Sequence, residues 1–564
     1  MLLMPASQLT KNDSAEKQEV INRQFRRIIS LLFILAVSPG VAATAKNADA
    51  GLSGSEVSTA PHIDQQLNNI IRQHNLTGNP AKGLALPEIS SPKPQLGMKL
   101  FFSKSLSGNL DVACASCHHP FLGGGDNLSL PIGINSLDDN IVGPKRRHRD
   151  LRAMLVPRNA PTTFNIALWK RMMFHDGRIE QRWDGTITTP DAPYPQADTQ
   201  AGSNLVQAQA RFPVTAANEM RGHSFDKDGS TQSCREALAA RLGGYETHEA
   251  NEAPLEKKLA GYWLDQLRAV LQDNAADSAK LLENTALTQT LGNLQRTQNN
   301  DLATDNQQYW LTQFRQAFTK PEASAQQLIT EQNISIALSE YQRSQVFIET
   351  PWKKYIEGDK DAISSQAKQG ALLFYKPASN GGFDCVSCHS GDFFTDENFH
   401  HTLMPPIGPG KENQAGLRRA NHDAGRSLVT GKTEDNFHFR TPSLLNVEVT
   451  GPWGHNGAYT TLANAVRHML NPYRMALNYN RLQLQQKHIP LTALQAGIDE
   501  MLTHDVDLQV HTYTEDDVQA LIAFLQSLTD PCVKDRNCLA DWIPDSGDND
   551  PLKLQLRAFN SQQE

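Results

Sequence analysis

The chain has 564 residues, enough to bury more than one hydrophobic core. Hydrophobic residues make up 39% and charged residues 20%, a composition that excludes a mostly disordered chain. The net charge of -8 argues against a nucleic-acid-binding protein, because such proteins generally present a basic face.

The N-terminus has the order of a secretory signal peptide. Three arginines within residues 23–27 precede the apolar run 28–37, and small residues come next, with cleavage predicted after Ala43 or Ala45. The run is about half as long as a bilayer-spanning helix. We therefore predict a signal peptide at residues 1–45, a periplasmic location, and no membrane span once the signal is removed.

Helical spacing of apolar residues dominates the rest of the chain. Residues 46–95 are polar and rich in Pro, and we expect an extended lead-in there. Strand alternation is scarce, so the predicted fold class is mostly α, with long Gly/Pro loops. The clearest predicted helices are Leu255–Leu271, Leu311–Phe318, Asn333–Phe347, Ser364–Phe374, Leu462–Leu470 and Thr514–Leu528.

The two halves of the chain carry similar motifs in the same order. In each half a Leu/Phe cluster precedes Cys-x-x-Cys-His. After it come an Arg that is followed two or three residues later by Pro, and then a His-x-Gly motif. The simplest interpretation is two related domains that arose by internal duplication. We assign residues 96–330 to the N-terminal domain with a helical insert, 331–531 to the C-terminal domain, and 532–564 to a tail.

Cys-x-x-Cys-His is the attachment motif for c-type haem, in which the thiols bond to the haem and the His binds iron. A redox thiol pair or half of a zinc site are the alternatives. A zinc ribbon would need both pairs close together, but they lie in different halves of the chain. Two covalently bound c-type haems are therefore predicted, held by Cys114, Cys117 and His118 and by Cys385, Cys388 and His389.

Three further cysteines lie outside these motifs. Cys532 and Cys538 close a short loop, and an oxidising compartment would let them form a disulfide. Cys234 is then left over, and its pairing with either of the other two stays open.

The order of motifs resembles the bacterial dihaem cytochrome c peroxidase family, which also contains the dihaem enzyme that matures methylamine dehydrogenase. The resemblance runs from about Gly97 to about Leu528. It rests on several separate motifs besides the two haem sites: residues 96–102, 158–162, 175–178, 218–220, 439–442 and 455–457.

The resemblance implies two cytochrome c-like haem domains and the reduction of hydrogen peroxide to water. Electrons would enter at the C-terminal haem from a small cytochrome c or cupredoxin and pass to the N-terminal haem, where peroxide is split. Two alternatives stay open: a dihaem oxidase that modifies a partner protein, and a non-catalytic dihaem electron carrier. A homodimer is also left open, and no nucleic acid is expected as a partner.

The resemblance also implies site residues. Glu219, directly before Met220, matches the acid/base of the peroxidatic pocket, and Gln209 matches a Gln that shares this pocket, although Gln207 is close. Met469 matches the second axial ligand of the C-terminal haem, at a place where the protein-modifying relative has Tyr. For an implied calcium ion the matching residues are Asn159, Thr450 and Pro452.

The sequence departs from the family pattern at two places. Where many members carry a His that blocks the first haem at rest, this chain has Ile134, so we expect an open haem or a different blocking residue such as His148. Where members often carry a Trp between the haems, this chain has His175. Either His175 or the nearby Trp183 is expected to assist electron passage.

Overall fold

The computed structural model describes residues 60–150, 156–226, 229–244, 301–411, 423–491, 494–545 and 550–557, with isolated positions between 260 and 291. Residues 60–564 form one compact unit. The chain is mostly helical, as predicted. Beyond the helices discussed below, it contains α4 (Leu205–Ala210), α5 (Thr231–Arg241), α9 (Asp301–Phe318), α10 (Ala325–Leu328), α12 (Pro351–Glu357), α14 (Ser427–Thr430), α16 (Pro472–Leu477) and α17 (Leu494–Met501).

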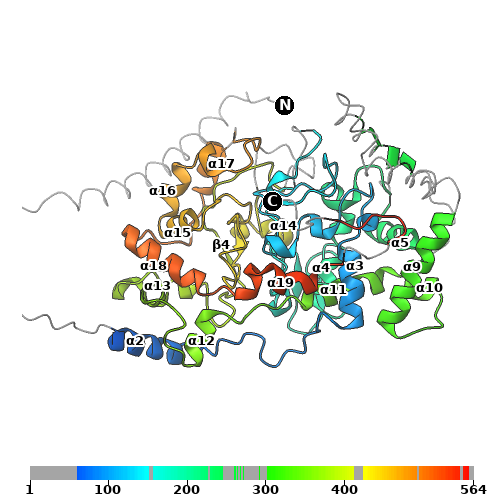
Figure 1. Ribbon diagram of the computed structural model, residues 1–564. Coiled ribbons are helices and arrows are strands. Elements are labelled where there is room, and N and C mark those ends of the chain that lie inside the picture. Colours follow the sequence, from blue (N-terminus) through cyan, green and yellow to red (C-terminus); the bar gives the residue numbers. More distant parts are fainter. Residues whose placement is uncertain are drawn as a thin grey trace, which may run out of the picture. The chain divides into compact units, whose positions relative to one another are not determined.

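A crossed pair of helices forms the centre of the first half. Helix α3 (Pro92–Phe101) packs against α11 (Glu331–Arg343), and the two lie side by side in Figure 1. They approach so closely that a Cβ at Gly97 would collide with the carbonyl oxygen of Ala337. One turn further along each helix, the rings of Phe101 and Tyr341 are 4.9 Å apart. Only glycine allows this approach of the two backbones.

The same arrangement recurs in the second half. Helix α13 (Ser365–Tyr375) packs against α18 (Glu515–Gln526), again side by side in Figure 1. A Cβ at Gly370 would collide with the carbonyl oxygen of Ala520. One turn further along, the rings of Phe374 and Phe524 are 5.1 Å apart. Each Cys-x-x-Cys-His motif comes after the first helix of its pair.

Replacing Gly370 with Ala is expected to lower the free energy of unfolding by about 2–3 kcal/mol. The new methyl group meets a backbone carbonyl, which cannot rotate away, so α13 and α18 must separate. Urea denaturation followed by far-UV circular dichroism measures the loss. Gly261→Ala is the matched control, because nothing lies within 4 Å of its Cβ position. An equal change in the free energy of unfolding for both substitutions would contradict the close approach of α13 and α18 at Gly370.

Several predicted helices are confirmed. Residues 311–318 lie in α9, and α15 (Leu462–Leu470) and α13 match closely. At α18 the side chain of Thr514 accepts a hydrogen bond from the backbone N–H of Asp517, as the capping pattern predicts. The helix predicted at Leu255–Leu271 lies largely outside the described residues.

The helix predicted to end at Phe347 ends earlier, at Arg343. The side chain of Asn165 explains the difference. Its amide donates to the carbonyl of Phe347 at 3.0 Å and its oxygen accepts from the Phe347 N–H at 2.7 Å. These long-range bonds use the backbone groups that a continuing helix would need.

The extended lead-in predicted at residues 46–95 is wrong for its second part. Residues 60–73 form α2 (Ala60–Gln73), which packs against α13 and buries Leu67 in the core of the second half. An ion pair of 2.9 Å joins Asp64 of this helix to Lys368. Apolar residues spaced three to four apart give α2 an apolar face, a signal that its polar composition obscured.

The domain boundaries predicted at 330/331 and 531/532 do not separate independent cores. Helix α11, assigned to the C-terminal domain, packs into the first core with Leu96 and Phe101. The tail also returns to the first half, where the Leu556 N–H donates to the carbonyl of Phe102 at 2.8 Å. The two halves therefore share one compact unit.

Short strands join the two halves near their interface. Strands β1 (Met172–Met173), β2 (Ile179–Gln181) and β3 (Ile187–Thr188) form an antiparallel sheet, and β4 (Phe399–His400) pairs antiparallel with β5 (Phe439–Arg440). The backbone N–H of Arg440 donates to the carbonyl of His175 at 2.8 Å. This bond connects the His-Asp-Gly segment of the first half to β5 of the second.

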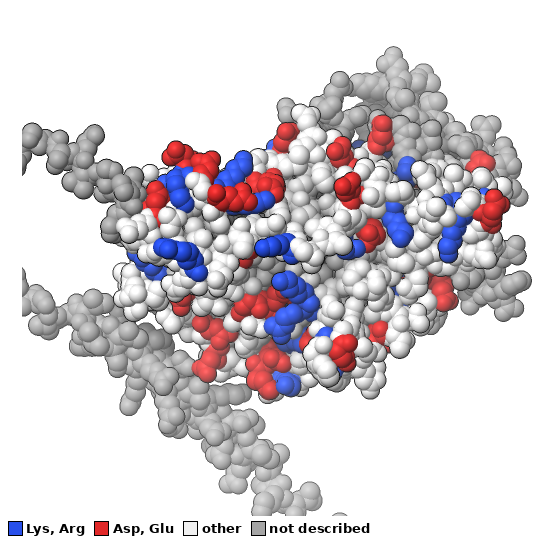
Figure 2. Space-filling view, turned by 90° about the horizontal axis from the view of Figure 1, so that it is seen from below, with Lys and Arg blue, Asp and Glu red and all other residues white. Residues whose placement is uncertain are grey.

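The tail is held by a disulfide between Cys532 and Cys538, as predicted, at the start of α19 (Arg536–Leu539). Cys234 is buried and unpaired, with its thiol 3.8 Å from the carbonyl of Val214. The predicted signal peptide lies outside the described residues, and among those that are described no helix is long and apolar enough to cross a membrane. Acidic and basic side chains are interspersed on the face shown in Figure 2.

Candidate active site

The first Cys-x-x-Cys-His motif forms a short turn, Cys114–Ser116, directly before His118. The Nδ1 atom of His118 is 3.3 Å from the carbonyl oxygen of Gly124, and the backbone of Pro161 also hydrogen bonds to this ring. An Nδ1–H that donates to a carbonyl fixes the tautomer and leaves the Nε2 lone pair for a metal ion. Burial lowers the pKa of His118, so the ring is neutral at pH 7.

The second motif repeats this geometry. The turn Cys385–Ser387 precedes His389, whose Nδ1 atom is 3.0 Å from the carbonyl oxygen of Phe394. The backbone of Pro442 takes the place that Pro161 has in the first half. Burial lowers the pKa of His389 as well, so both imidazoles are neutral potential ligands.

None of the four motif cysteines forms a disulfide. Burial raises the pKa of Cys114 and Cys385 to about 12 and raises that of Cys117 as well, so these thiols are protonated at pH 7. Unpaired thiols beside a neutral imidazole with an available Nε2 are the groups that a covalently attached haem requires.

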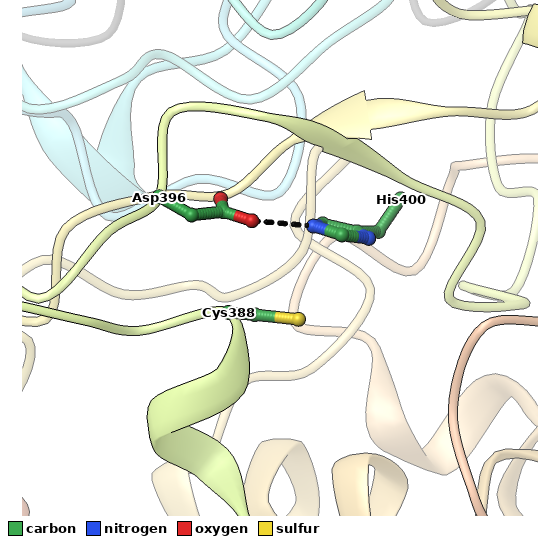
Figure 3. Close-up of side chains that lie close together, drawn as sticks. All are labelled: Cys388, Asp396 and His400. Atoms are coloured by element: carbon green, nitrogen blue, oxygen red, sulfur yellow. Dashed lines mark hydrogen bonds and ion pairs between the residues drawn. The ribbon is translucent and has the colours of Figure 1, made fainter.

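Cys388 lies close to two other potential metal ligands, Asp396 and His400 (Figure 3). The ligand atoms of the three residues are within 4.8 Å of one another, and His400 Nε2 is 2.8 Å from an oxygen of Asp396. The thiol of Cys388, however, belongs to the haem-attachment motif. Once it is bonded to haem it is no longer a thiolate donor, so we do not assign a separate metal ion to this group.

Glu219 lies on a single π-helical turn, Ala217–Arg221, a form of helix that is rare and frequent at functional sites. The segment containing Gly133 packs against it so tightly that a Cβ at Gly133 would collide with the carbonyl of Asn218. Burial raises the pKa of Glu219, while the positive charges of Arg178 and Lys411 oppose this. The electrostatic influence of Glu219 reaches Cys117, so the carboxylate lies near the first haem-attachment site.

Gln209 and Gln207 differ in how their side chains are bonded. Within the described part of the chain the Oε1 atom of Gln209 is buried and accepts no hydrogen bond. Gln207 is bonded instead to Ser203, Gln332 and Ser335. A buried acceptor without a partner is costly unless a ligand satisfies it. Gln209 is therefore the better candidate for contact with a bound group, as the sequence assignment has it.

A buried ionic network lies between the two halves. The carboxylate of Asp176 forms ion pairs with Arg158 at 2.6 Å, Lys411 at 2.9 Å and Arg178 at 3.1 Å. Asp423 accepts two hydrogen bonds of 2.7 Å from the guanidinium of Arg158. The network therefore ties the His-Asp-Gly-Arg segment to two loops of the second half.

Residues 91–253 match the sequence model of the family described as di-haem cytochrome c peroxidase. The matched residues include the first Cys-x-x-Cys-His motif and Glu219. This similarity supports an enzyme of the peroxidase class and implies two c-type haems.

Relatives of two kinds match most of the chain. Methylamine utilization protein MauG of Methylorubrum extorquens is 26% identical over 74% of this chain and 79% of its own length. Cytochrome c551 peroxidase of Nitrosomonas europaea is 22% identical over 77% of this chain and 79% of its own length. Among solved structures, the diheme peroxidase BthA from Burkholderia thailandensis aligns with a TM-score of 0.44 and 19% identity, covering 80% of this chain and 88% of that one.

The structure places Ile134, which departs from the family pattern, and His148, the alternative blocking residue. The side chain of Ile134 is buried in the first core, and its backbone N–H donates to the carbonyl of Asn218, next to Glu219. His148 lines the same cavity of about 280 Å³ as Ile134 and Asn218.

The structure separates the two candidates for inter-haem electron passage in this peroxidase. Trp183 is 92% exposed in the turn between β2 and β3, so the expectation that it could lie between the haems is wrong. His175 lies inside, with its Nε2–H donating to the carbonyl of Asn159 at 3.1 Å. Burial, followed by the charge of Arg158, lowers its pKa to about 4, so the ring is neutral at pH 7.

The remaining predicted ligands come from both halves. Met469 is on α15, one turn after Val466, and is 37% exposed. The amide of Asn159 donates to the carbonyls of Leu128 and Ser129, which leaves its oxygen for a cation. Pro452 forms a cis peptide bond with Gly451, which follows Thr450 directly. Their assignments to iron and to calcium stay predictions.

Sequence reasoning missed Asp176, Arg178 and Lys411 as parts of this site. The first two were present in a recognised motif but carried no assigned role. Lys411 gave no sequence signal at all, because only the folded chain brings the loop after β4 to Asp176.

Replacing Asp423 with Asn is expected to lower the free energy of unfolding by about 3 kcal/mol at pH 7, because it breaks a buried charge pair. Burial opposes ionisation, but Arg158 outweighs it and holds the pKa of Asp423 at about 2. A depressed folded pKa adds stability above about pH 4 that disappears as the pH falls toward 2. Urea unfolding should therefore show a smaller difference from wild type at pH 3 than at pH 7. A loss of equal size at both pH values would contradict this account.

Proposed function

We propose that the chain reduces hydrogen peroxide to water with electrons from a small redox protein. The observation that carries the proposal is the position of Glu219, on a π-helical turn that packs against Gly133. The neighbouring carbonyl of Ile132 lies 3.8 Å from the Sγ atom of Cys117 in the first Cys-x-x-Cys-His motif. The family match and the peroxidase relatives support the same reaction. The predicted signal peptide supports a periplasmic location, and a small cytochrome c or cupredoxin is the proposed donor.

In this proposal the first half reduces peroxide and the second half receives the electrons. When bound, the haem of the first half supplies the redox chemistry that breaks the O–O bond. Glu219 accepts a proton from the incoming peroxide and returns it to the departing oxygen, so that water leaves. Gln209, whose Oε1 lacks a partner, orients the substrate by hydrogen bonding. His118 holds the first haem, and His389 with Met469 holds the second, where electrons enter.

The resting state of the first half depends on Ile134. Its side chain cannot bind iron, so we propose that the distal side of this haem is open before reduction. The calcium ion implied by the family would be held by the side-chain oxygen of Asn159 and the backbone carbonyls of Thr450 and Pro452. We also infer that the halves arose by internal duplication, which the matching crossings at Gly97 and Gly370 support.

A second candidate is a dihaem oxidase that modifies a partner protein. The similarity to MauG favours it, as does Trp183, which lies fully exposed two residues after β2 and could contact such a partner. Met469 favours the peroxidase, because the resemblance places Tyr there in the protein-modifying relative. Turnover of peroxide with a reduced small cytochrome separates the two, since the oxidase would show none.

The proposed function is tested by absorption and electron paramagnetic resonance spectra of the purified ferric protein. We expect one high-spin haem that reacts at once with one equivalent of peroxide. Two low-spin haems that stay inert to peroxide, even after half-reduction, would leave the non-catalytic electron carrier as the function.

A further inference from the structure

Arg440 carries a buried charge for which no ion-pair partner lies in the described part of the chain. The residue is 9% exposed. Its Nη1 atom donates to the carbonyl of Met172 at 2.7 Å, but its buried Nε–H has no hydrogen-bond partner among the described residues. A buried charge without a counter-charge is strongly unfavourable, so an anion is expected beside this guanidinium.

The matching arginine of the first half has two such partners. Arg158 and Arg440 each come two or three residues before the proline whose backbone hydrogen bonds to the haem-attachment histidine of their half. Arg158 forms ion pairs with Asp176 at 2.6 Å and with Asp423 at 2.7 Å. The described chain therefore neutralises the first arginine itself and leaves the second for another anion.

Glu397 and Asp176 act on Arg440 only from beyond ion-pair distance. Burial lowers the pKa of Arg440 to about 9, and the charges of these two carboxylates oppose this. The Glu397 carboxylate instead accepts hydrogen bonds from the backbone N–H groups of Lys170 at 3.1 Å and Arg171 at 2.8 Å. Asp176 already pairs with three other cations. The guanidinium is therefore cationic at pH 7 and able to pair with a further carboxylate.

The guanidinium of Arg440 lies against the loops that hold His389. It stacks on the ring of Trp169, with its Cζ atom 3.3 Å from the ring centroid. The same ring contacts Phe393 edge-on at 5.0 Å, and the next residue, Phe394, supplies the carbonyl bonded to His389 Nδ1. The second loop is that of Arg440 itself, since the proline two residues later bonds to the same imidazole. Both loops thus connect this charge to the second haem-attachment site.

We propose that Arg440 binds a propionate carboxylate of the haem attached to Cys385 and Cys388. A haem brings two carboxylates of its own, and a guanidinium matches a carboxylate in both charge and geometry. The ring of Trp169 covers one face of the guanidinium and the Met172 carbonyl holds Nη1, which leaves Nε–H to donate to the propionate. The inference rests on the second haem, which the proposed function also requires, but not on the reaction with peroxide.

Such a contact raises the reduction potential of the second haem. A cation beside the porphyrin stabilises the ferrous form, because reduction places one more electron next to it. Arg440 also cancels the charge of the propionate, which would otherwise favour the ferric form. The pair thus makes this haem a better acceptor at the place where electrons are proposed to enter.

The test compares Arg440→Gln with Arg440→Lys in the full haem-loaded chain. One readout is the reduction potential of each haem, measured by spectroelectrochemical titration. The other is the redox-induced infrared difference spectrum of protein whose haem propionate carboxyl carbons are labelled with carbon-13, so that the label identifies their bands. Arg171→Gln is the matched control, because Arg171 is an exposed arginine two residues after Trp169, and its Nη1 donates to the side chain of Asn398 at 3.0 Å.

We expect Arg440→Gln to shift the equilibrium of the second haem about tenfold toward the ferric form, which is a potential lower by about 59 mV. The labelled propionate bands should move in this variant, because a carboxylate loses its partner. Arg440→Lys keeps the charge but not the donor geometry, so it should retain most of the wild-type potential while the bands still move. Arg171→Gln should change neither readout. If Arg440→Gln fails to attach two haems, the bands of Arg440→Lys decide alone.

Unchanged propionate bands, with or without a change in potential, would overturn the proposal, since Arg440 would then not contact a propionate. A wild-type potential that depends on chloride at constant ionic strength would also overturn it, because Arg440 would then hold a free anion. Failure of the proposed function looks different: the wild type would not reduce peroxide, while both readouts would still report on Arg440.

Discussion

The Glu219→Gln variant should react with hydrogen peroxide about 10²–10⁴-fold more slowly than the wild type. Gln has the same shape but cannot take a proton from the peroxide or return it to the departing oxygen. The carboxylate is held on a π-helical turn, so the loss of its proton-transfer group is not made good by a neighbouring residue of that turn. Stopped-flow absorption with a single equivalent of peroxide measures this step separately from electron delivery.

The matched control for this prediction is Glu434→Gln, since Glu434 is an exposed carboxylate of the second half. It should leave the rate unchanged. Both variants should keep two attached haems, because neither residue touches a Cys-x-x-Cys-His motif. A Glu219→Gln protein that keeps the wild-type rate would mean that another group transfers the proton, and the cavity containing His148 would be the place to look.

Replacing both Cys385 and Cys388 with Ala should reduce the haem content from two per chain to one and abolish steady-state turnover with a reduced donor. Neither motif thiol forms a disulfide, so both are available for bonding to haem. The first haem would remain attached, so a single reaction with peroxide should still occur. Haem content per chain and donor oxidation measure the two effects.

Cys234→Ala is the control, because this cysteine is buried but lies outside both motifs. It should keep two haems and full turnover. Full turnover in the Cys385/Cys388 variant would show that electrons enter at the first haem directly. The proposal that they enter at the second haem would then be wrong.

Local signals in the sequence were sufficient to predict α13, α18 and the two haem-attachment motifs. Thr514 and the acidic first turn predicted α18, and the motif spacing located both pairs of cysteines and their histidines. The sequence did not show that α11 crosses α3, because such packing depends on a close approach at Gly97 rather than on any pattern within α11. The polar composition of α2 hid its apolar face for the same reason: burial of Leu67 depends on α13.

The candidate site was predictable to the extent that single residues carry the chemistry. Glu219 and Gln209 were found from motif order, and the unpartnered Oε1 of Gln209 now distinguishes it from Gln207. The buried ionic network was not predictable from the sequence, because Asp176 forms ion pairs with Arg158 and Lys411, which lie far apart along the chain. The prediction that Trp183 assists electron passage relied on its nearness to His175 in the sequence. Trp183 lies in the turn between β2 and β3, where its side chain is exposed.

The return of residues 550–557 to the first half has a consequence for how the chain matures. The Lys104 N–H donates to the carbonyl of Leu554 at 2.9 Å, and Leu552 and Leu554 are buried there. A chain that emerges from its N-terminus exposes Cys114 and Cys117 long before this closing segment arrives. The first cofactor can therefore be attached while its domain is still open, and docking of residues 550–557 then seals a domain that is already loaded.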